Sequence, residues 1–208
     1  MTRTRLGLVA DTHVPEAGPD LPCEAYEALA GCAQILHCGD LHTLDVVDRL
    51  ERIAPTLVSR GNGDRRSPRG ARPGVPDDPR VADTHVVIVN GFRVGISHDL
   101  GHTEVRSDVD VVGLLARRFD GRVDIAVSGH SHVPLIRGLA DGTALVNPGS
   151  PTMPYGYVGI VGTLALLDLE ETSFEITVID LATGSTQLRM AGPAAHPQQR
   201  GPRPTGGR

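Results

Sequence analysis

The chain has 208 residues, a formal net charge of −5 and a sequence pI near 6.0. It has no tryptophan and no lysine, and all 20 of its basic residues are arginine, which excludes Schiff-base lysine chemistry and a P-loop ATPase and argues against stable nucleic-acid binding. No apolar run reaches the roughly 18 residues of a membrane span and no signal peptide is recognisable, so we expect a cytoplasmic protein with no membrane partner.

The first 60 residues alternate between strand and helix patterns. Short apolar runs predict strands at 5–10, 34–37 and 56–59. Helices are expected after the first two of these strands, one capped by Asp20 and one capped by Thr43. Strand-then-helix units joined by short links indicate a parallel sheet that is built from βαβ units.

The composition changes abruptly in the next segment. Residues 65–80 contain five Arg, four Pro and two Gly, which predicts a mobile loop inserted into the domain. One interpretation is a solvated insertion without a role. The other is that Arg65, Arg66 or Arg69 lies at the rim of a site and binds a phosphate group.

Strand patterns return in the second half of the chain. Two apolar runs at 85–89 and 92–96 flank Asn90-Gly91, a strong hairpin signal. Ser107 is expected to cap a helix, and further strands are predicted at 123–127, 143–146, 163–169 and 173–181. Residues 191–208 are rich in Gly, Pro and Arg and have nothing to bury. We therefore expect one α/β domain over residues 1–190 and a disordered tail.

Polar residues directly follow five of the predicted strands. They are Asp11 and His13, Asp40, Asn62, His98, and His130 with His132. Ligands of open α/β sheets bind at the carboxyl ends of the strands, so these side chains should meet at one edge. A mixture of carboxylate, imidazole and amide donors suits Mn, Fe, Zn or Ni, and the lack of Cys disfavours a structural zinc site. Seven donors are better explained by two ions that share a carboxylate than by one.

The motifs D-x-H, G-D, G-N-x-D, a lone His after a strand, and G-H-x-H occur in this order. The series resembles the calcineurin-like metallophosphoesterase superfamily, in particular its small bacterial and archaeal phosphodiesterase branch, which is related to the retromer-subunit fold. The resemblance extends over residues 5–180. It implies a four-layer αββα sandwich of two mixed β-sheets flanked by helices.

The resemblance also implies a set of metal ligands. The first metal would be held by Asp11, His13, Asp40 and His132, and the second by Asp40, Asn62, His98 and His130. Two divalent ions per subunit are implied, with Mn expected first and Fe, Zn, Ni or Mg as alternatives. Asp64 would orient a ligand, and Asn147-Pro-Gly-Ser150 would support the site. The implied reaction is in-line attack of a metal-bridging hydroxide on a small phosphoester, and a diester is the expected substrate.

The sequence departs from the family pattern at one position that matters for chemistry. Many phosphatases of this superfamily carry G-N-H, whose His can protonate the leaving group, but here the third residue is Gly63. This favours phosphodiesters with good leaving groups, unless His102 or His42 serves as the acid. Asp99 also replaces a Gly that is frequent after the lone His. His37 and His42 both flank Asp40. For His37 we expect a structural role before a direct role in the site.

Two other functions remain open at this stage. One is a phosphomonoesterase that acts on a small phosphorylated metabolite, against which Gly63 argues mildly. The other is a non-catalytic protein-binding scaffold on the same fold, against which the completeness of the seven-residue ligand set argues. Small members of the family often self-associate, so the resemblance also allows a homo-oligomer.

Overall fold

The computed structural model describes residues 3–67, 73–101, 103 and 106–193. The strands of this part of the chain form two mixed β-sheets, of seven and five strands. The larger sheet has the order β12-β11-β10-β1-β2-β3-β4, and its strands are β1 (Thr4–Val9), β2 (Gln34–His37), β3 (Thr56–Ser59), β4 (Val81–Ala82), β10 (Thr163–Leu169), β11 (Ser173–Asp180) and β12 (Ser185–Pro193). The smaller sheet has the order β5-β6-β7-β9-β8, and its strands are β5 (Thr84–Val89), β6 (Phe92–Ser97), β7 (Ile125–Val127), β8 (Leu135–Gly138) and β9 (Ala144–Asn147).

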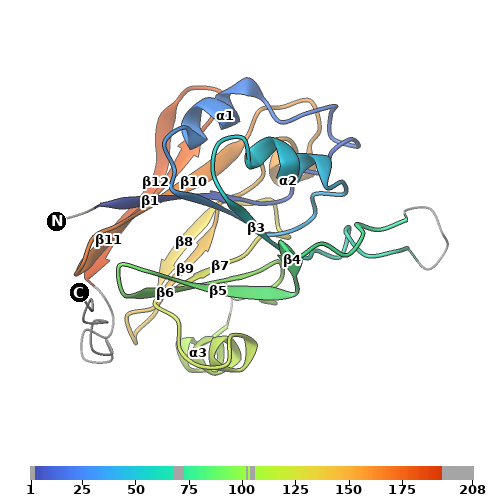
Figure 1. The fold of residues 1–208 in the computed structure, drawn as a ribbon. Coiled ribbons are helices and arrows are strands. Elements are labelled where there is room, and N and C mark those ends of the chain that lie inside the picture. The colour runs from blue at the N-terminus through green and yellow to red at the C-terminus, as the bar shows by residue number, and fades with distance from the viewer. Residues whose placement is uncertain (1–2, 68–72, 102, 104–105, 194–208) are drawn as a thin grey trace, which may run out of the picture.

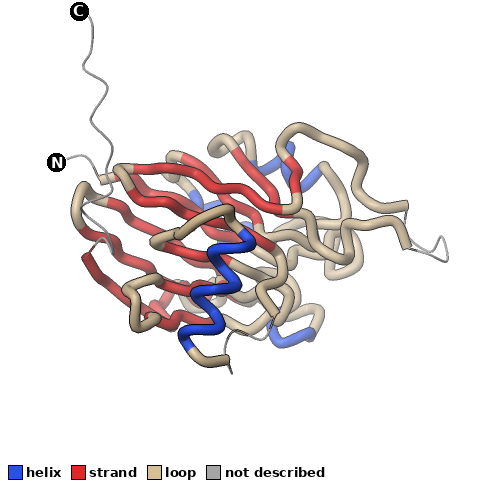
Figure 2. Tube along the Cα trace, turned by 90° about the horizontal axis from the view of Figure 1, so that it is seen from below, coloured by secondary structure: helices blue, strands red, loops and turns tan. Residues whose placement is uncertain are grey.

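Helices cover the outer faces of both sheets. Helices α1 (Cys23–Leu29) and α2 (Asp45–Leu50) lie on the larger sheet, and α3 (Asp108–Arg118) lies on the smaller one (Figure 1). Figure 2 shows α3 crossing the outer face of its sheet. The expected four-layer αββα sandwich of two mixed sheets is confirmed. No helix in the described part of the chain has both the length and the hydrophobicity that a membrane span requires.

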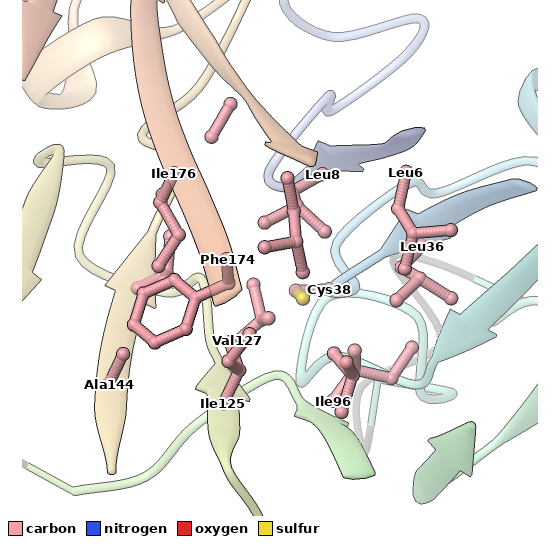
Figure 3. Close-up of a cluster of buried hydrophobic side chains, with 14 of the residues drawn as sticks. Leu6, Leu8, Leu36, Cys38, Ile96, Ile125, Val127, Ala144, Phe174 and Ile176 are labelled. Carbon is pink, nitrogen blue, oxygen red and sulfur yellow. The ribbon is translucent and has the colours of Figure 1, made fainter. Parts of the chain in front are cut away.

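Three hydrophobic clusters hold the four layers together. The central cluster lies between the sheets and combines side chains such as Leu8 and Ile176 from the larger sheet with Ile96 and Val127 from the smaller one (Figure 3). A second cluster lies under α1 and α2, and a third lies under α3. The buried apolar area of these layers is the main favourable term in folding, and it fixes how the two sheets face each other.

The sequence pattern located most strands within one or two residues. The strands predicted at 34–37, 56–59 and 163–169 are observed with those bounds. Asn90 and Gly91 both adopt positive φ in the β5–β6 turn, as expected for the hairpin. β7 is shorter than the predicted strand 123–127. The parallel pairing of β1, β2 and β3 confirms the βαβ interpretation.

The helix caps were predicted less well. Ser107 caps α3 as expected, accepting a hydrogen bond from Asp110 N. The prediction for Asp20 was wrong, because α1 begins after Pro22 and the Asp20 carboxylate instead accepts from Tyr26 Oη at 2.6 Å. The prediction for Thr43 was also wrong by one residue, since Leu44 occupies the cap position of α2.

Three strands were missed, and all lie at sheet edges: β4 and β12 in the larger sheet and β8 in the smaller one. β4 has only two residues, directly after the Pro- and Arg-rich region, so no periodicity reveals it. β12 extends through Pro193, so the first three residues of the expected tail belong to the sheet. Residues 194–208 lie outside the described residues, as do 68–72 of the expected loop. The described base of that loop is anchored, because Val75 is buried and its N–H donates to Asp64 O at 2.7 Å.

The strand register brings the carboxyl ends of five strands to one edge of the sandwich. Val9 of β1 pairs with His37 of β2, and His37 pairs with Val58 of β3. In the smaller sheet Ile96 of β6 pairs with Val127 of β7. The segments that follow these five strands therefore emerge side by side, which is where ligands bind in open α/β sheets.

One ion-pair cluster joins β1 to β10 and makes stability depend on pH. Asp168 accepts two hydrogen bonds from Arg5 at 2.9 and 3.0 Å and one from Arg3. Burial alone would raise the pKa of Asp168, but the arginine hydrogen bonds outweigh it and lower this pKa to about 2. A depressed folded-state pKa contributes stability that is present above the unfolded value and is lost as the pH falls.

We therefore expect Asp168→Asn to lower the free energy of unfolding at pH 7 by about 1–2 kcal/mol, a value reduced for the solvent exposure of the arginines. The difference from the wild type should shrink between pH 4 and pH 2, where the wild-type carboxylate becomes protonated. Urea unfolding of both proteins at pH 7, 5 and 3 measures this. A difference that is the same at pH 7 and pH 3 would contradict the assigned role of the ion pair.

Candidate metal centre

The first cluster of predicted ligands brings β1 together with the segment after β7. The metal-binding atoms of Asp11, His13 and His132 all lie within 4.8 Å of one another. Nε2 of His13 is 3.2 Å from Nε2 of His132, which in turn is 3.8 Å from Asp11 Oδ1. The His130 backbone N–H donates to both carboxylate oxygens of Asp11, at 3.1 and 2.9 Å, and holds the carboxylate in place.

The second cluster joins segments that follow β2, β3, β6 and β7. Nε2 of His98 lies 2.9 Å from Asn62 Oδ1, 3.2 Å from His130 Nδ1 and 3.5 Å from Asp40 Oδ1. Asp40 Oδ2 lies 3.7 Å from His13 Nε2 of the first cluster. The structure thus brings all seven predicted ligands together, and Asp40 lies between the two clusters.

Hydrogen bonds fix the direction in which two of the imidazoles present a lone pair. His98 donates from Nδ1 to Cys38 O at 2.8 Å, and His132 donates from Nδ1 to Met153 O at 2.8 Å. Their other ring nitrogens, Nε2, are turned into the site, 2.9 Å from Asn62 Oδ1 in the first case and 3.2 Å from His13 Nε2 in the second. Acceptor atoms that converge in this way suit a cation, because ligand imidazoles bind metals in the neutral form and hold their other nitrogen by a hydrogen bond.

Burial and mutual repulsion shape the charges of the site. Burial raises the pKa of Asp11 well above its usual value, and the nearby Asp40 raises it further. Burial lowers the pKa of His13 to about 4, so its ring is neutral at physiological pH. No arginine among the described residues forms an ion pair with either carboxylate. Two buried carboxylates with imidazoles around them and no arginine partner fit divalent cations, which would compensate their charge.

The backbone of the site is unusual. Six residues of the metal-binding segments adopt positive φ values between 45° and 72°, a region that costs free energy for residues other than Gly. They are Asp11, His13, Asp40, His42, His130 and His132. A left-handed residue reverses the chain sharply after a strand. The tight turns therefore place two side chains of one short segment in the same site, as the D-x-H and H-x-H spacings require.

Asp64 supports the site through backbone groups. Its side chain is fully buried and accepts hydrogen bonds from Asp40 N and Gly61 N through Oδ2 and from His42 N through Oδ1, at 2.8–2.9 Å. The sequence analysis expected Asp64 to orient a ligand. The contacts fit this expectation, although Asp64 holds the main chain of Asp40 rather than a ligand side chain.

The segment that begins at Asn147 supports the opposite side. Asn147 Nδ2 donates to Gly129 O at 2.8 Å, and Ser150 Oγ donates to Asp11 O at 2.7 Å. Gly129 itself must lack a side chain, since a Cβ there would approach Asp11 Oδ2 to 2.7 Å. These contacts agree with the support expected for Asn147-Pro-Gly-Ser150.

The remaining histidines separate into structural and site residues. His37 is fully buried beneath the site, where its Nδ1 accepts from Gly39 N and its Nε2–H faces Thr12 Oγ1 at 3.1 Å. Burial lowers its pKa to about 4, so it acts as a neutral support for the loops. His42 instead contacts the His13 ring within the site. His102, the other candidate acid, lies outside the described residues.

Of the arginines predicted to bind phosphate, one lines a pocket at the site. Arg65 lines a pocket of about 270 Å³ together with Asn62, His98 and His130, and it pairs with exposed Asp83 at 2.7 Å. Arg66 is not among the residues that line this pocket, and Arg69 lies outside the described residues.

Sequence reasoning missed several contributors to the site. Arg60, directly before the G-N-x-D motif, and Arg118, in a region without a motif, also line the small pocket. Glu16 hydrogen-bonds to His42 at 2.6 Å, and the carbonyls of Cys38 and Met153 orient His98 and His132. Backbone carbonyls leave no sequence signal, and Arg118 reaches the site only through the fold. A larger pocket of about 510 Å³, lined by apolar residues such as Leu100 and Leu135, adjoins His130.

Comparisons with known proteins agree with this geometry. The family profile described as "Calcineurin-like phosphoesterase superfamily domain" matches residues 4–172. A "Probable metallophosphoesterase" of Methanothermobacter thermautotrophicus is 35% identical over 149 residues, which are 72% of this chain and 78% of the relative.

Among solved structures, Vacuolar Protein Sorting 29 from Cryptosporidium parvum superimposes with a TM-score of 0.69 at 22% identity, covering 93% of this chain and 98% of that one. Vps29 of Entamoeba histolytica complexed with Zn²⁺ gives a TM-score of 0.65 at 22% identity, covering 91% and 99%. These two likenesses concern the fold. From the profile match and the archaeal relative, the chain belongs to the calcineurin-like phosphoesterase superfamily.

Proposed function

We propose that this protein is a dinuclear-metal-dependent phosphodiesterase. The observation that carries the proposal is the convergence of seven acceptor-bearing side chains from five strand ends around two buried carboxylates. A phosphoesterase follows from the superfamily. The two cations, their identity and the preference for diesters are the parts that we add.

The proposed ligand sets follow the two clusters. Asp11, His13, Asp40 and His132 hold one cation, and Asp40, Asn62, His98 and His130 hold the other. Nitrogen and carboxylate donors without thiolates favour Mn²⁺, with Fe, Zn, Ni or Mg as alternatives. When bound, two divalent cations supply an acidified water molecule and positive charge that offsets the charge of the phosphoryl oxygens.

The chain's own groups determine how a substrate would be held. The small pocket at Asn62, His98 and His130 is lined by Arg60, Arg65 and Arg118, and guanidinium groups recognise phosphoryl oxygens. Gly63 provides no imidazole for the leaving group, so the site favours esters whose leaving group departs readily as an anion. We therefore assign a small phosphodiester as substrate and expect the protein to work in the cytoplasm.

A substrate panel tests the preference for diesters. Protein reconstituted with Mn²⁺ is expected to hydrolyse an aryl phosphodiester at least about 10-fold faster, in kcat/KM, than the corresponding monoester, since a factor of 10 requires only about 1.4 kcal/mol. 2′,3′-Cyclic nucleotides complete the panel. Comparable rates on the monoester and the diester would favour the phosphomonoesterase alternative instead.

The shared carboxylate gives the sharpest test of the metal centre. Asp40→Asn is expected to lower kcat by at least about 100-fold and to reduce bound Mn²⁺ below two ions per chain, because the bridge between the cations is lost. Elemental analysis and steady-state kinetics measure the two effects. In metal-free buffer the variant should unfold at a higher temperature than the wild type, since Asp40 no longer repels Asp11.

Asp45→Asn is the matched control for this variant, because Asp45 is an exposed aspartate five residues further along the chain. It should leave both kcat and metal content unchanged. Undiminished turnover of Asp40→Asn with two bound ions would refute the bridging role.

The neighbouring arginines at the loop base offer a second matched pair. Arg65→Ala is expected to raise KM for the diester about 3- to 10-fold with little change in kcat, because the loss of one exposed charged contact costs about 1 kcal/mol. Arg66→Ala, which removes an arginine outside the pocket, should change neither constant. Equal effects of the two substitutions would show that the loop acts only through its overall charge. Point variants are preferable to deleting the loop, because Val75 is part of a hydrophobic core.

The scaffold alternative draws on one specific feature. Exposed apolar side chains follow the site at Tyr155, Tyr157, Val158 and Ile160, and the Vps29 structures share the fold. A protein-binding scaffold would show no turnover on any ester of the panel, even with two Mn²⁺ ions bound. The substrate panel therefore decides between the two functions.

A further inference from the structure

His42 is held inside the site although it belongs to none of the predicted ligand sets. Its side chain is only 5% exposed, and its ring meets the His13 ring edge-on with the centroids 4.5 Å apart. Its backbone N–H is bound by Asp64 Oδ1 at 2.8 Å, and its φ of 67° turns the side chain back from the G-D segment. The local backbone therefore directs this imidazole toward the carboxylate of Asp40.

The second nitrogen of the ring has a carboxylate partner. His42 Nδ1 lies 2.6 Å from Glu16 Oε2, so the Nδ1–H donates to Glu16 and Nε2 is the ring nitrogen that could bind a metal. A carboxylate behind a histidine is the arrangement that fixes the tautomer and strengthens the basicity of metal-binding imidazoles. Candidate metal-binding atoms of His13, Asp40 and His42 all lie within 4.8 Å of one another, which is the spacing of ligands around one ion.

Gly63 makes room for this imidazole. A Cβ at position 63 would lie 2.3 Å from His42 Nε2 and 2.9 Å from its Cδ2. The same Cβ would also lie 3.0 Å from Asp40 Oδ1, which accepts a hydrogen bond from Gly63 N at 2.6 Å. A side chain at 63 and the observed position of the His42 ring therefore exclude each other. The missing histidine of the G-N-H pattern and the inward position of His42 are two parts of one arrangement.

We propose that His42 is an additional ligand of the divalent cation that Asp40 and His13 hold, with Glu16 as its positioning partner. This inference rests on the metal centre of the proposed function and extends it by one imidazole. The expected ion is of borderline character, such as Mn²⁺, Co²⁺ or Zn²⁺, since a further neutral nitrogen donor favours these over Mg²⁺ and Ca²⁺. The added donor raises the coordination number on the Asp40 side of the centre.

Titration with Co²⁺ tests the proposal without any measurement of activity. Full-length His42→Ala and His42→Gln proteins are compared with the wild type by calorimetry and by visible absorption, which reports the coordination geometry of Co²⁺. We expect both variants to bind one of the two ions at least about 10-fold more weakly and to show an altered absorption band. Glu16→Gln should lower the affinity for the same ion by a smaller factor.

His85→Ala is the matched control, because His85 is a partly buried histidine outside the site whose Nε2 bonds to Val58 O. It should leave the Co²⁺ affinity and spectrum unchanged. Wild-type Co²⁺ affinity and spectrum in both His42 variants would overturn the proposal. If Co²⁺ binding is unchanged in the His42 variants but their kcat is lower, His42 contacts the substrate instead of a cation.

The exclusion between positions 42 and 63 has its own test. Gly63→His alone should lower the melting temperature, because the new side chain clashes with the His42 ring. The double variant His42→Ala, Gly63→His should recover most of that loss, since the space is then free. Equal destabilisation of the single and double variants would show that the ring of His42 does not occupy the space beside Gly63.

The Asp40→Asn protein separates failure of this inference from failure of the proposed function. If Asp40→Asn loses Co²⁺ while the His42 variants keep wild-type binding, only the role of His42 is wrong. If Asp40→Asn also keeps two tightly bound ions, the proposed metal centre itself is wrong.

Discussion

Two buried carboxylates determine the design of this site. Asp11 and Asp40 lie at the junction of the two sheets with almost no solvent contact, and burial together with mutual repulsion raises the pKa of Asp11. An uncompensated buried charge costs several kcal/mol. The surrounding groups are imidazoles and one amide, and among the described residues no arginine pairs with either carboxylate. The centre is therefore built for cations, and the hydrophobic layers provide the stability that the site itself does not.

The position of the centre follows from the way the two sheets meet. The larger sheet supplies the carboxylates and Asn62, and the smaller one supplies His98, His130 and His132. His98 bonds to Cys38 O and Ser150 bonds to Asp11 O, so hydrogen bonds cross from one sheet to the other next to Ala10 and Cys38 of the central hydrophobic core. Neither sheet could form the site alone. The strained left-handed residues persist because these cross-sheet contacts fix them on both sides.

Near His42, the space left by a motif position without a side chain is filled by a side chain from another loop. A glycine at position 63 provides no imidazole, and the same absence of a side chain admits the ring of His42 from a different loop. The ring is backed by Glu16 and lies with His13 and Asp40 in one group of candidate metal-binding side chains.

The amino-acid sequence alone specified the sandwich class, most of the strands and the seven candidate ligands, because apolar periodicity and polar residues at strand ends are local signals. It placed the caps of α1 and α2 wrongly and missed β4, β8 and β12, since these depend on contacts with distant parts of the chain. It could not show that Arg118 reaches the site, that Val75 anchors the arginine-rich loop or that His42 fills the space beside Gly63. Only the tertiary structure decides such matters, because the residues involved are far apart in sequence and are brought together by the packing of the two sheets.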